Sequence, residues 1–313
     1  MSNVGIDVSK ARLDVAVRPS SESFSVANDE AGHQELRKRL QKVHPERIVL
    51  EATGGYERDV VQVLLEAKLP VLVVNPRNVR QFAQSTGRLA KTDRLDAAVL
   101  AHYGEALRPE IRPLADVQQL EFEALVRRRR QLVEMKASEL KRKQQARKSV
   151  VAKIERVIDF LEKQVQDIDK DIDDFIKKTP VWREQEELLR SVPGVGPVLS
   201  RTLMALVPEL GHLTGKAVAA LVGVAPLNND SGKHVGQRST WGGRAPVRAV
   251  LYMATVTACR YNPHLAAVYK RLRDKGKPAK VALVACMRKL LTLVNAIQRD
   301  GRPWTPTLLP THA

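Results

Sequence analysis

The chain has 313 residues and a large excess of positive charge, with 52 Lys and Arg against 35 Asp and Glu and a formal net charge of +17. This length allows two domains and a connector, each with its own core. The basic excess favours a polyanionic partner over a merely basic soluble protein, because phosphates neutralised by Lys and Arg release counterions. Aromatic residues make up only 4%, which argues against base stacking as the main mode of binding.

Two cysteines, Cys259 and Cys286, lie in apolar segments without a CxxC pair or a histidine at ligand spacing. This pattern argues against a zinc site and against a disulfide framework, and it predicts reduced core cysteines. A strand begins within a few residues of the N-terminus, and no stretch is expected to reach the length of a membrane span. We therefore expect a soluble cytoplasmic protein without a membrane partner.

Residues 1–112 predict an α/β domain. The segments VGIDV, RLDVAVR, SFSVA, RIVL and PVLVV are short and rich in β-branched residues, and we expect strands there. Helices are expected over about 29–42 and 56–68. Three strands in quick succession, followed by alternating helices and strands, predict a mixed sheet covered by helices. Asp14, on the second strand, is expected to have a structural role.

Four acids carry the candidate chemistry of this domain. Asp7 and Glu51 fall at strand ends, while Asp93 and Asp96 are three residues apart on one face of a helix for which Thr92 is a possible N-cap. If these carboxylates converge, they must hold protons or bind a cation. Oxygen ligands select Mg²⁺ or Mn²⁺, and two such ions can clamp a phosphoryl transfer. The alternative is four unrelated surface acids.

Basic residues between the last strand and Asp93 are candidates for contacts with a nucleic-acid backbone. The alternative is a solvated helix face. The candidates are Arg77, Arg80, Arg88 and Lys91.

A helical connector is expected over 113–180, after prolines at 109 and 113 that disfavour helix. Its second half carries a heptad seam, which indicates a coiled-coil hairpin or a dimerising helix, and self-association is favoured over an intramolecular hairpin. The first half is basic and is a candidate for nucleic-acid binding. The seam is Ile154, Ile158, Leu161, Val165, Ile168, Ile172 and Phe175, and the basic run is Arg127, Arg128, Arg129 and Arg130.

Residues 181–300 predict a mainly helical domain, followed by a loose tail over 301–313. The segment around SVPGVGP predicts a helix-hairpin-helix, in which Gly194 and Gly196 allow backbone N–H groups to hold a phosphate. The alternative is a plain helical hairpin packed in a core. Further on, the long polar stretch LNNDSGKHVGQRSTWGGRAP contains Ser231. Loops of this length are often functional, although a serine in a loop is usually a turn residue.

Five motifs, GIDVSK, EATGGY, NPRNVRQFAQSTGRLAKTDRLDA, SVPGVGP and GVAPLNNDSG, resemble in order and spacing the DEDD-type transposases of the insertion-sequence 110/1111 family, which are related to Piv-type DNA invertases. The resemblance covers nearly the whole chain. It implies a RuvC-like, ribonuclease-H-like N-terminal domain whose metal ligands and catalytic acids are Asp7, Glu51, Asp93 and Asp96. The chain departs from the family pattern at Trp241-Gly242-Gly243.

The resemblance further implies that Ser231 attacks a DNA phosphodiester to form a phosphoserine link. Lys233 and Arg238 could neutralise the phosphoryl charge. It also implies a structured bridge RNA that pairs with donor and target double-stranded DNA, and a homo-oligomer, a dimer or a tetramer in synapsis, in a bacterial cytoplasm. Charge with few aromatics agrees with a protein that leaves sequence choice to base pairing.

Together with this resemblance, the sequence implies an RNA-guided, site-specific DNA recombinase that moves an insertion sequence. One rival is a metal-dependent, junction-resolving nuclease that uses the same acids with water as the nucleophile. The other is a non-catalytic nucleic-acid-binding scaffold, in which the acids only cap helices and bind water.

Overall fold

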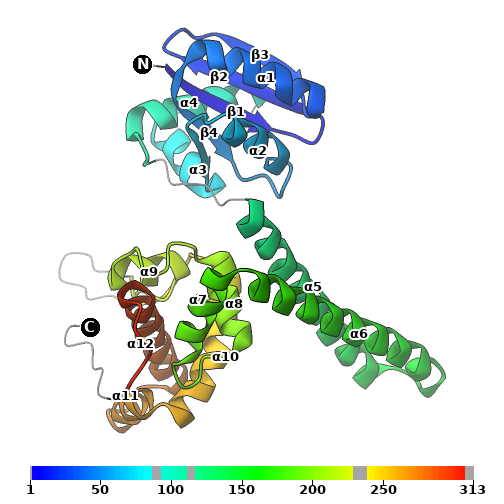
Figure 1. Ribbon diagram of the computed structural model, residues 1–313, viewed down its shortest axis with the longest axis vertical. Helices are drawn as coiled ribbons and strands as arrows, with labels where there is room; N and C mark the ends of the chain where they lie inside the picture. Colours follow the sequence, from blue (N-terminus) through cyan, green and yellow to red (C-terminus); the bar gives the residue numbers. More distant parts are fainter. Residues whose placement is uncertain (1, 87–92, 111–116, 228–237, 307–313) are drawn as a thin grey trace. The chain divides into compact units, whose positions relative to one another are not determined.

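The computed structural model describes residues 2–86, 93–110, 117–227 and 238–306 (Figure 1). The chain divides into two units, 1–114 and 115–313. The first is a mixed sheet covered by helices and the second is helical, which confirms the predicted α/β plus α composition. The helices predicted as a connector belong to the second unit.

Unit 1 is built on five strands in the order β3-β2-β1-β4-β5. The first three pair antiparallel, and β4 and β5 continue the sheet in parallel with β1. This arrangement is compatible with a RuvC-like domain. The strands are β1 (Ser2–Val8), β2 (Arg12–Arg18), β3 (Ser23–Ala27), β4 (Pro45–Glu51) and β5 (Val71–Val74).

Alternating side chains send the two faces of the sheet to different helices, as a pleated strand requires. On β1, the side chains of Val4 and Ile6 are buried in a core shared with the first two helices. The opposite face packs against the last two helices of the unit. These helices are, in order, α1 (Glu30–Val43), α2 (Arg58–Glu66), α3 (Pro76–Ser85) and α4 (Asp93–Leu107) (Figure 1).

Gly5 allows α4 to lie directly on β1. A Cβ atom at Gly5 would come within 2.1 Å of the carbonyl oxygen of Ala97 and 2.3 Å of the amide nitrogen of Ala101. At Gly104, near the other end of α4, a Cβ would lie 3.6 Å from the side-chain oxygen of Asn3. The helix therefore runs antiparallel to β1, and its N-terminus lies at the end where β1 and β4 finish.

Unit 2 begins with an antiparallel helical hairpin of α5 (Val117–Gln145) and α6 (Lys148–Lys178). The predicted seam lies inside this hairpin, since Ile158, Leu161 and Ile172 on α6 are buried within a single chain and α5 is the helix packed beside α6 (Figure 1). The structure therefore contains the intramolecular hairpin, which was the less favoured of the two predictions. The seam gives no argument for self-association, and the oligomeric state stays a prediction.

The remaining helices form one apolar core with the root of the hairpin. Phe122 of α5, Phe175 of α6 and Trp182 of α7 join the two parts, with ring centroids 4.9–5.8 Å apart. These helices are α7 (Pro180–Arg190), α8 (Pro197–Leu206), α9 (Gly215–Val222), α10 (Ala245–Tyr261), α11 (Pro263–Asp274) and α12 (Ala279–Asp300).

Within the described chain, α12 is the one helix long and apolar enough to cross a membrane, so the expectation that no stretch reaches that length does not hold for it. Core helices pass the same test, and α12 buries Leu290 and Val294 in unit 2. It also buries Cys286, beside the half-buried Cys259. Both thiols are free, and burial raises the pKa of Cys286 to about 12.

The segment after α12, predicted to be loose, is held at Trp304. Its backbone N–H donates to Ser191 Oγ at 2.8 Å, and its ring makes an edge contact with His264. Residues 307–313 lie outside the described chain.

Candidate functional site

Asp7 and Glu51 lie at the same end of neighbouring parallel strands. Ile6 of β1 is level with Leu50 of β4, so Asp7 and Glu51 occupy the next position on each strand. Val49 packs in the core under α4, and strand alternation puts Glu51 on that same face. Both carboxylates are half-buried. The pairing of β1 with β4 therefore brings the backbones of Asp7 and Glu51 to neighbouring positions, as the predicted convergence of these two acids requires.

The start of α4 lies at this end of the sheet too. Asp7 lies two residues beyond Gly5, which is about 6.6 Å along a strand. Asp93 begins α4, four residues before Ala97, which is about 6 Å along a helix. Since Ala97 sits on Gly5, the backbone of Asp93 reaches the level of Asp7. Asp96 is half-buried, whereas the side chain of Asp93 lies outside the described residues.

Asp14 is a further carboxylate on this face, opposite Asp7 in the register of β1 and β2. It is buried, and it accepts hydrogen bonds from Arg12 Nε at 2.9 Å and Ser25 Oγ at 2.5 Å. Facing acids on adjacent strands repel each other. The ion pair with Arg12 offsets that repulsion, which agrees with a structural role for Asp14.

Glu57 shapes the turn that follows Glu51. Its Oε2 accepts from the backbone N–H of Gly55 at 2.9 Å and that of Thr53 at 3.1 Å. Burial alone would raise the pKa of the Glu57 carboxyl, but these hydrogen bonds outweigh it and hold the pKa below its ordinary value. The carboxylate of Glu57 therefore fixes the turn that follows Glu51 at the end of β4.

Among the residues whose side chains are described, no group of three or more His, Cys, Asp or Glu could hold a metal ion. Asp7, Glu51 and Asp96 fall within that search and do not form such a group, whereas the Asp93 side chain lies outside the described residues. The oxygen donors at this end of the sheet are nevertheless of the type that Mg²⁺ and Mn²⁺ prefer.

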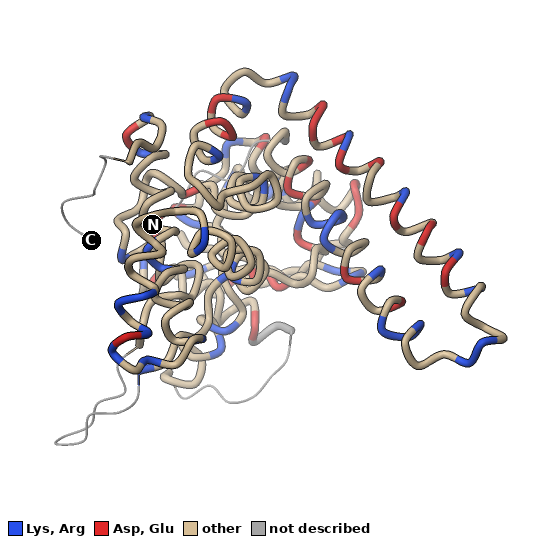
Figure 2. The backbone as a smooth tube through the Cα atoms, turned by 90° about the horizontal axis from the view of Figure 1, so that it is seen from below, with Lys and Arg blue, Asp and Glu red and all other residues tan. Residues whose placement is uncertain are grey.

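The cations predicted to bind nucleic acid differ in their surroundings. Arg77 and Arg80 are exposed on α3, and Arg88 and Lys91 lie outside the described residues. The four arginines of α5 all have partners: Arg127 with Glu123, Arg128 with Gln131, Arg129 with Asp169, and Arg130 with Glu134. Basic and acidic positions alternate along much of the hairpin (Figure 2). Its charge is largely neutralised within the chain.

The predicted helix-hairpin-helix is present as α7, a turn and α8. Gly194 has φ +96°, and a Cβ there would lie 2.4 Å from the Cβ of Ala258 on α10. Gly194 thus serves the packing of the turn. Gly196, the N-cap of α8, has open space where its Cβ would be. Phosphate binding at this turn stays a prediction.

The loop that contains Ser231 has a fixed base. Ser231 and Lys233 lie outside the described residues, but Leu227 donates its N–H to the carbonyl oxygen of Ser239 at 2.8 Å. Below this bridge, a Cβ at Gly243 would lie 2.4 Å from the nitrogen of Gly223, so the two chain segments pack backbone to backbone. Arg248 donates to the carbonyl oxygens of Val222 and Gly242 and ties both segments to α10. The segment Trp241-Gly242-Gly243, at which the chain departs from the family pattern, therefore forms part of a rigid base of this loop.

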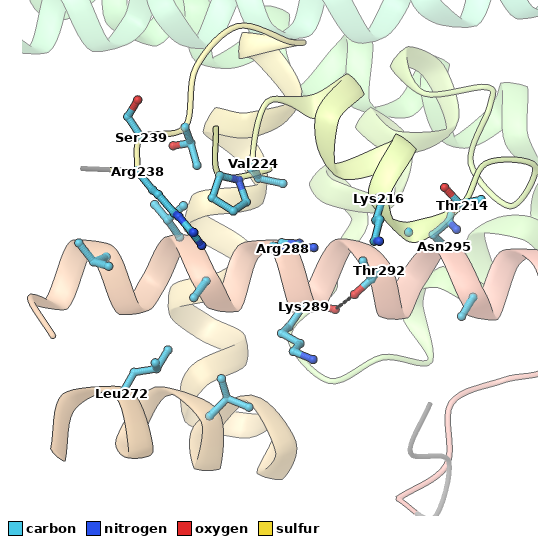
Figure 3. Close-up of a pocket in the computed structure, with 18 of the residues that line it drawn as sticks. Thr214, Lys216, Val224, Arg238, Ser239, Leu272, Arg288, Lys289, Thr292 and Asn295 are labelled. Atoms are coloured by element: carbon cyan, nitrogen blue, oxygen red, sulfur yellow. Dashed lines mark hydrogen bonds between the residues drawn. The ribbon is translucent and has the colours of Figure 1, made fainter. Parts of the chain in front are cut away.

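Beside this base is a cavity of about 1360 Å³ that the sequence did not predict as a unit; we call it the α12 groove (Figure 3). Of its described lining residues, seven are basic and none is acidic. One sequence feature could have indicated this groove: Arg288 and Lys289 interrupt an otherwise apolar helix. The basic residues come from four segments: Lys216, Arg238, Arg271, Lys280, Arg288, Lys289 and Arg299.

Comparisons with known proteins match two family models to this chain. Residues 4–162 match the family model of DEDD transposases of IS110, described as a transposase, and residues 186–270 match the transposase family IS116/IS110/IS902. The chain belongs to the IS110 family of transposases. It is therefore an enzyme of a family that acts on DNA.

Similar proteins include the pilin gene-inverting proteins of Moraxella bovis and Moraxella lacunata. Each is 28% identical over 313 residues, which cover 96% of this chain and 97% of the relative. The insertion element IS116 uncharacterized 44.8 kDa protein of Streptomyces clavuligerus is 31% identical over 140 residues, 44% of this chain and 35% of that protein. The similarity to the gene-inverting proteins thus extends through both units.

Proposed function

We propose that this IS110-family protein is a site-specific DNA recombinase that moves an insertion sequence through a phosphoserine intermediate. The observation that carries the proposal is the register of unit 1. Asp7 and Glu51 end adjacent parallel strands, and α4 begins at the same edge. Acids at one edge of such a sheet, in a chain of this family, support a catalytic site better than a scaffold.

Asp7, Glu51, Asp93 and Asp96 would hold Mg²⁺ or Mn²⁺ in this proposal. The bound cation would supply stabilisation of the charge that develops on the phosphoryl group. The protein's own contribution is to hold the carboxylates in position. Gly5 sets the height of α4 over β1, and Glu57 fixes the turn after Glu51.

Ser231 is the proposed nucleophile. A bond forms between its Oγ and phosphorus as the bond from phosphorus to the leaving sugar oxygen breaks. The proton from the serine hydroxyl is taken up by that leaving oxygen, so the phosphodiester energy is kept for rejoining. Lys233 and Arg238 would offset the phosphoryl charge. The rigid base at Leu227 and Ser239 supports a role in which the ends of this loop stay in place.

The proposed partners are donor and target double-stranded DNA and a bridge RNA that supplies sequence choice by pairing. The net charge of +17 and the low aromatic content support binding through backbone and shape. A homo-oligomer, a dimer or a tetramer in synapsis, is part of the proposal and rests on the family resemblance alone.

The test is a search for protein covalently attached to DNA in cells that carry the complete element. The protein is recovered under denaturing conditions, and wild type is compared with Ser231→Ala and Asp96→Asn. We expect a nuclease-sensitive mass shift in wild type alone. Cleaved DNA without any shift would replace the proposal with a hydrolytic nuclease, and undiminished recombination by Ser231→Ala would remove Ser231 as the nucleophile.

A further inference from the structure

We infer that the α12 groove binds the phosphodiester backbone of a nucleic-acid strand, without reading its sequence, beside the loop that carries Ser231. The inference rests on the proposed function only in regarding that strand as one that reaches the nucleophile. The binding site itself follows from the charge, depth and lining of the groove.

Four of the seven cations that line the α12 groove have no partner among the described residues. Within the described residues, the side chains of Lys216, Arg271, Lys280 and Arg288 form no hydrogen bond or ion pair, whereas Arg299 pairs with its neighbour Asp300 at 2.8 Å. Like charges gathered on one surface repel each other and weaken the fold. An anionic ligand would remove that cost.

Arg288 is the most informative of these cations because it is half-buried. It lies near the middle of α12, one turn from Val284 and Thr292, which also line the groove. A partly desolvated charge is normally compensated by a protein partner. Elsewhere in unit 2 this is so: Arg201 pairs with Glu186 at 2.9 Å, and Arg244 pairs with Glu209 at 2.6 Å. Arg288 has no such partner among the described residues, which points to an external anion.

Size and lining distinguish a polymer from a small ligand. A volume of about 1360 Å³ exceeds the roughly 300–1,000 Å³ of small-molecule sites. Aliphatic side chains such as Val268, Leu272 and Val284 separate the cations, and the described lining contains no aromatic residue. Bases therefore have no stacking platform. Contacts must go to phosphates and sugars, which do not encode sequence.

The position of the groove connects it to the nucleophile loop. Arg238, Ser239 and Thr240 line the groove directly after that loop, and Ser239 is half of the bridge that closes it. Figure 3 shows Arg238 and Lys216 reaching toward α12, which carries Arg288 between them. A strand held along α12 would thus pass the base of the Ser231 loop.

The test compares two triple variants of the full chain. The groove variant is Arg271→Gln, Lys280→Gln and Arg288→Gln. The matched control, Arg142→Gln, Lys170→Gln and Lys177→Gln, removes the same charge from exposed residues of α5 and α6 that pair with acids on their own helix. Fluorescence anisotropy with a short labelled DNA duplex, and separately with an RNA of the same length, is measured over a series of salt concentrations.

We expect the groove variant to bind on the order of 10- to 100-fold more weakly. The slope of log affinity against log salt should fall by about 2 to 3, close to 0.9 for each phosphate that the variant no longer neutralises. The control should change by less than about threefold. Weaker binding of both probes supports the inference, and weaker binding of one probe supports it and identifies that strand as DNA or RNA. Equal weakening in the two variants, or none in either, would overturn it.

Lysine acylation provides a second measurement on the wild-type protein. The DNA duplex should protect exposed Lys216 and Lys280 from the reagent and leave exposed Lys141 and Lys153 on the hairpin reactive. Protection of the hairpin lysines alone would contradict the inference. Neither measurement requires catalysis. A groove that binds normally in Ser231→Ala would survive the failure of the proposed nucleophile, and the proposed nucleophile would survive a groove that does not bind.

Discussion

The α5–α6 hairpin and the α12 groove are both rich in Lys and Arg, yet they treat this charge in opposite ways. On the hairpin, Lys136 pairs with Glu162 at 3.1 Å and Lys143 with Glu155 at 2.8 Å, across the two helices. In the groove, the described lining contains cations without acids. The hairpin uses charge to hold helices together, and the groove keeps charge available. A basic run in sequence therefore does not by itself mark a binding site.

The sheet edge of unit 1 that carries Asp7, Glu51 and Asp96 is acidic, whereas the α12 groove is basic. A substitution at this acidic edge should have the largest effect on activity. We expect Asp96→Asn to lower strand cleavage by about 10³-fold or more, because a proposed metal ligand is removed. Thermal stability should stay within about 0.5 kcal/mol of wild type, since the substitution keeps the size and shape of the side chain. Cleavage of a labelled donor duplex and a melting curve measure the two. Full cleavage by this variant would remove Asp96 from the site.

The contrast between paired and available cations predicts a large difference in stability. Arg201→Ala leaves Glu186, which is only 8% exposed, without its ion-pair partner, and we expect a loss of about 3–4 kcal/mol. Arg288→Gln should cost less than about 0.5 kcal/mol, because it breaks no ion pair with any residue that the structure describes. All three tryptophans lie in unit 2, so tryptophan fluorescence during urea unfolding follows that unit. Similar destabilisation in both variants would break the comparison.

Glu57 gives a smaller effect that depends on pH. Its folded pKa lies below the ordinary value of 4.5, so the unfolded state binds the proton more readily. The stabilisation is present above the ordinary value and is lost as the pH falls through the folded pKa. Glu57→Gln should cost about 1 kcal/mol near neutral pH and remove this dependence. Amide exchange at Thr53 and Gly55 is the measurement, and protection that does not change with pH in wild type would contradict it.

The smallest effect is expected on the hairpin. The double change Arg127→Gln and Arg130→Gln should lower DNA affinity by less than about threefold, because Glu123 and Glu134 already neutralise these arginines. Anisotropy with the duplex used for the groove variants checks this. A decrease as large as that of the groove variant would restore the basic run as a binding surface.

Much of the fold could be predicted because local patterns decide it. In unit 1 the strands follow short apolar, β-branched runs and the helices follow apolar residues spaced three to four apart. The predicted helical hairpin motif is present as α7 and α8. The break at residues 146–147 between α5 and α6 could not be read from sequence, since it contains neither Gly nor Pro. The helix that packs against the heptad seam could not be predicted either, because an apolar stripe does not specify whether the matching helix belongs to the same chain.

The candidate site was predictable only in part. Strand ends placed Asp7 and Glu51 correctly at one edge, because parallel neighbours finish together. Whether Arg129 and Arg288 form ion pairs could not be predicted, since this depends on which distant segments of the sequence fold beside them. Arg129 meets Asp169 from another helix, whereas Arg288 faces a surface assembled from several described segments that bring no acid.

The closed base of the Ser231 loop also has an evolutionary consequence. The bridge from Leu227 to Ser239 and the contact of Gly223 with Gly243 fix both ends of the segment between them. Lengthening such a segment adds little closure entropy, because that cost grows only with the logarithm of its length. Insertions and deletions could therefore accumulate between these anchor points while the helices below keep their packing. The base is a junction at which related enzymes could exchange loops.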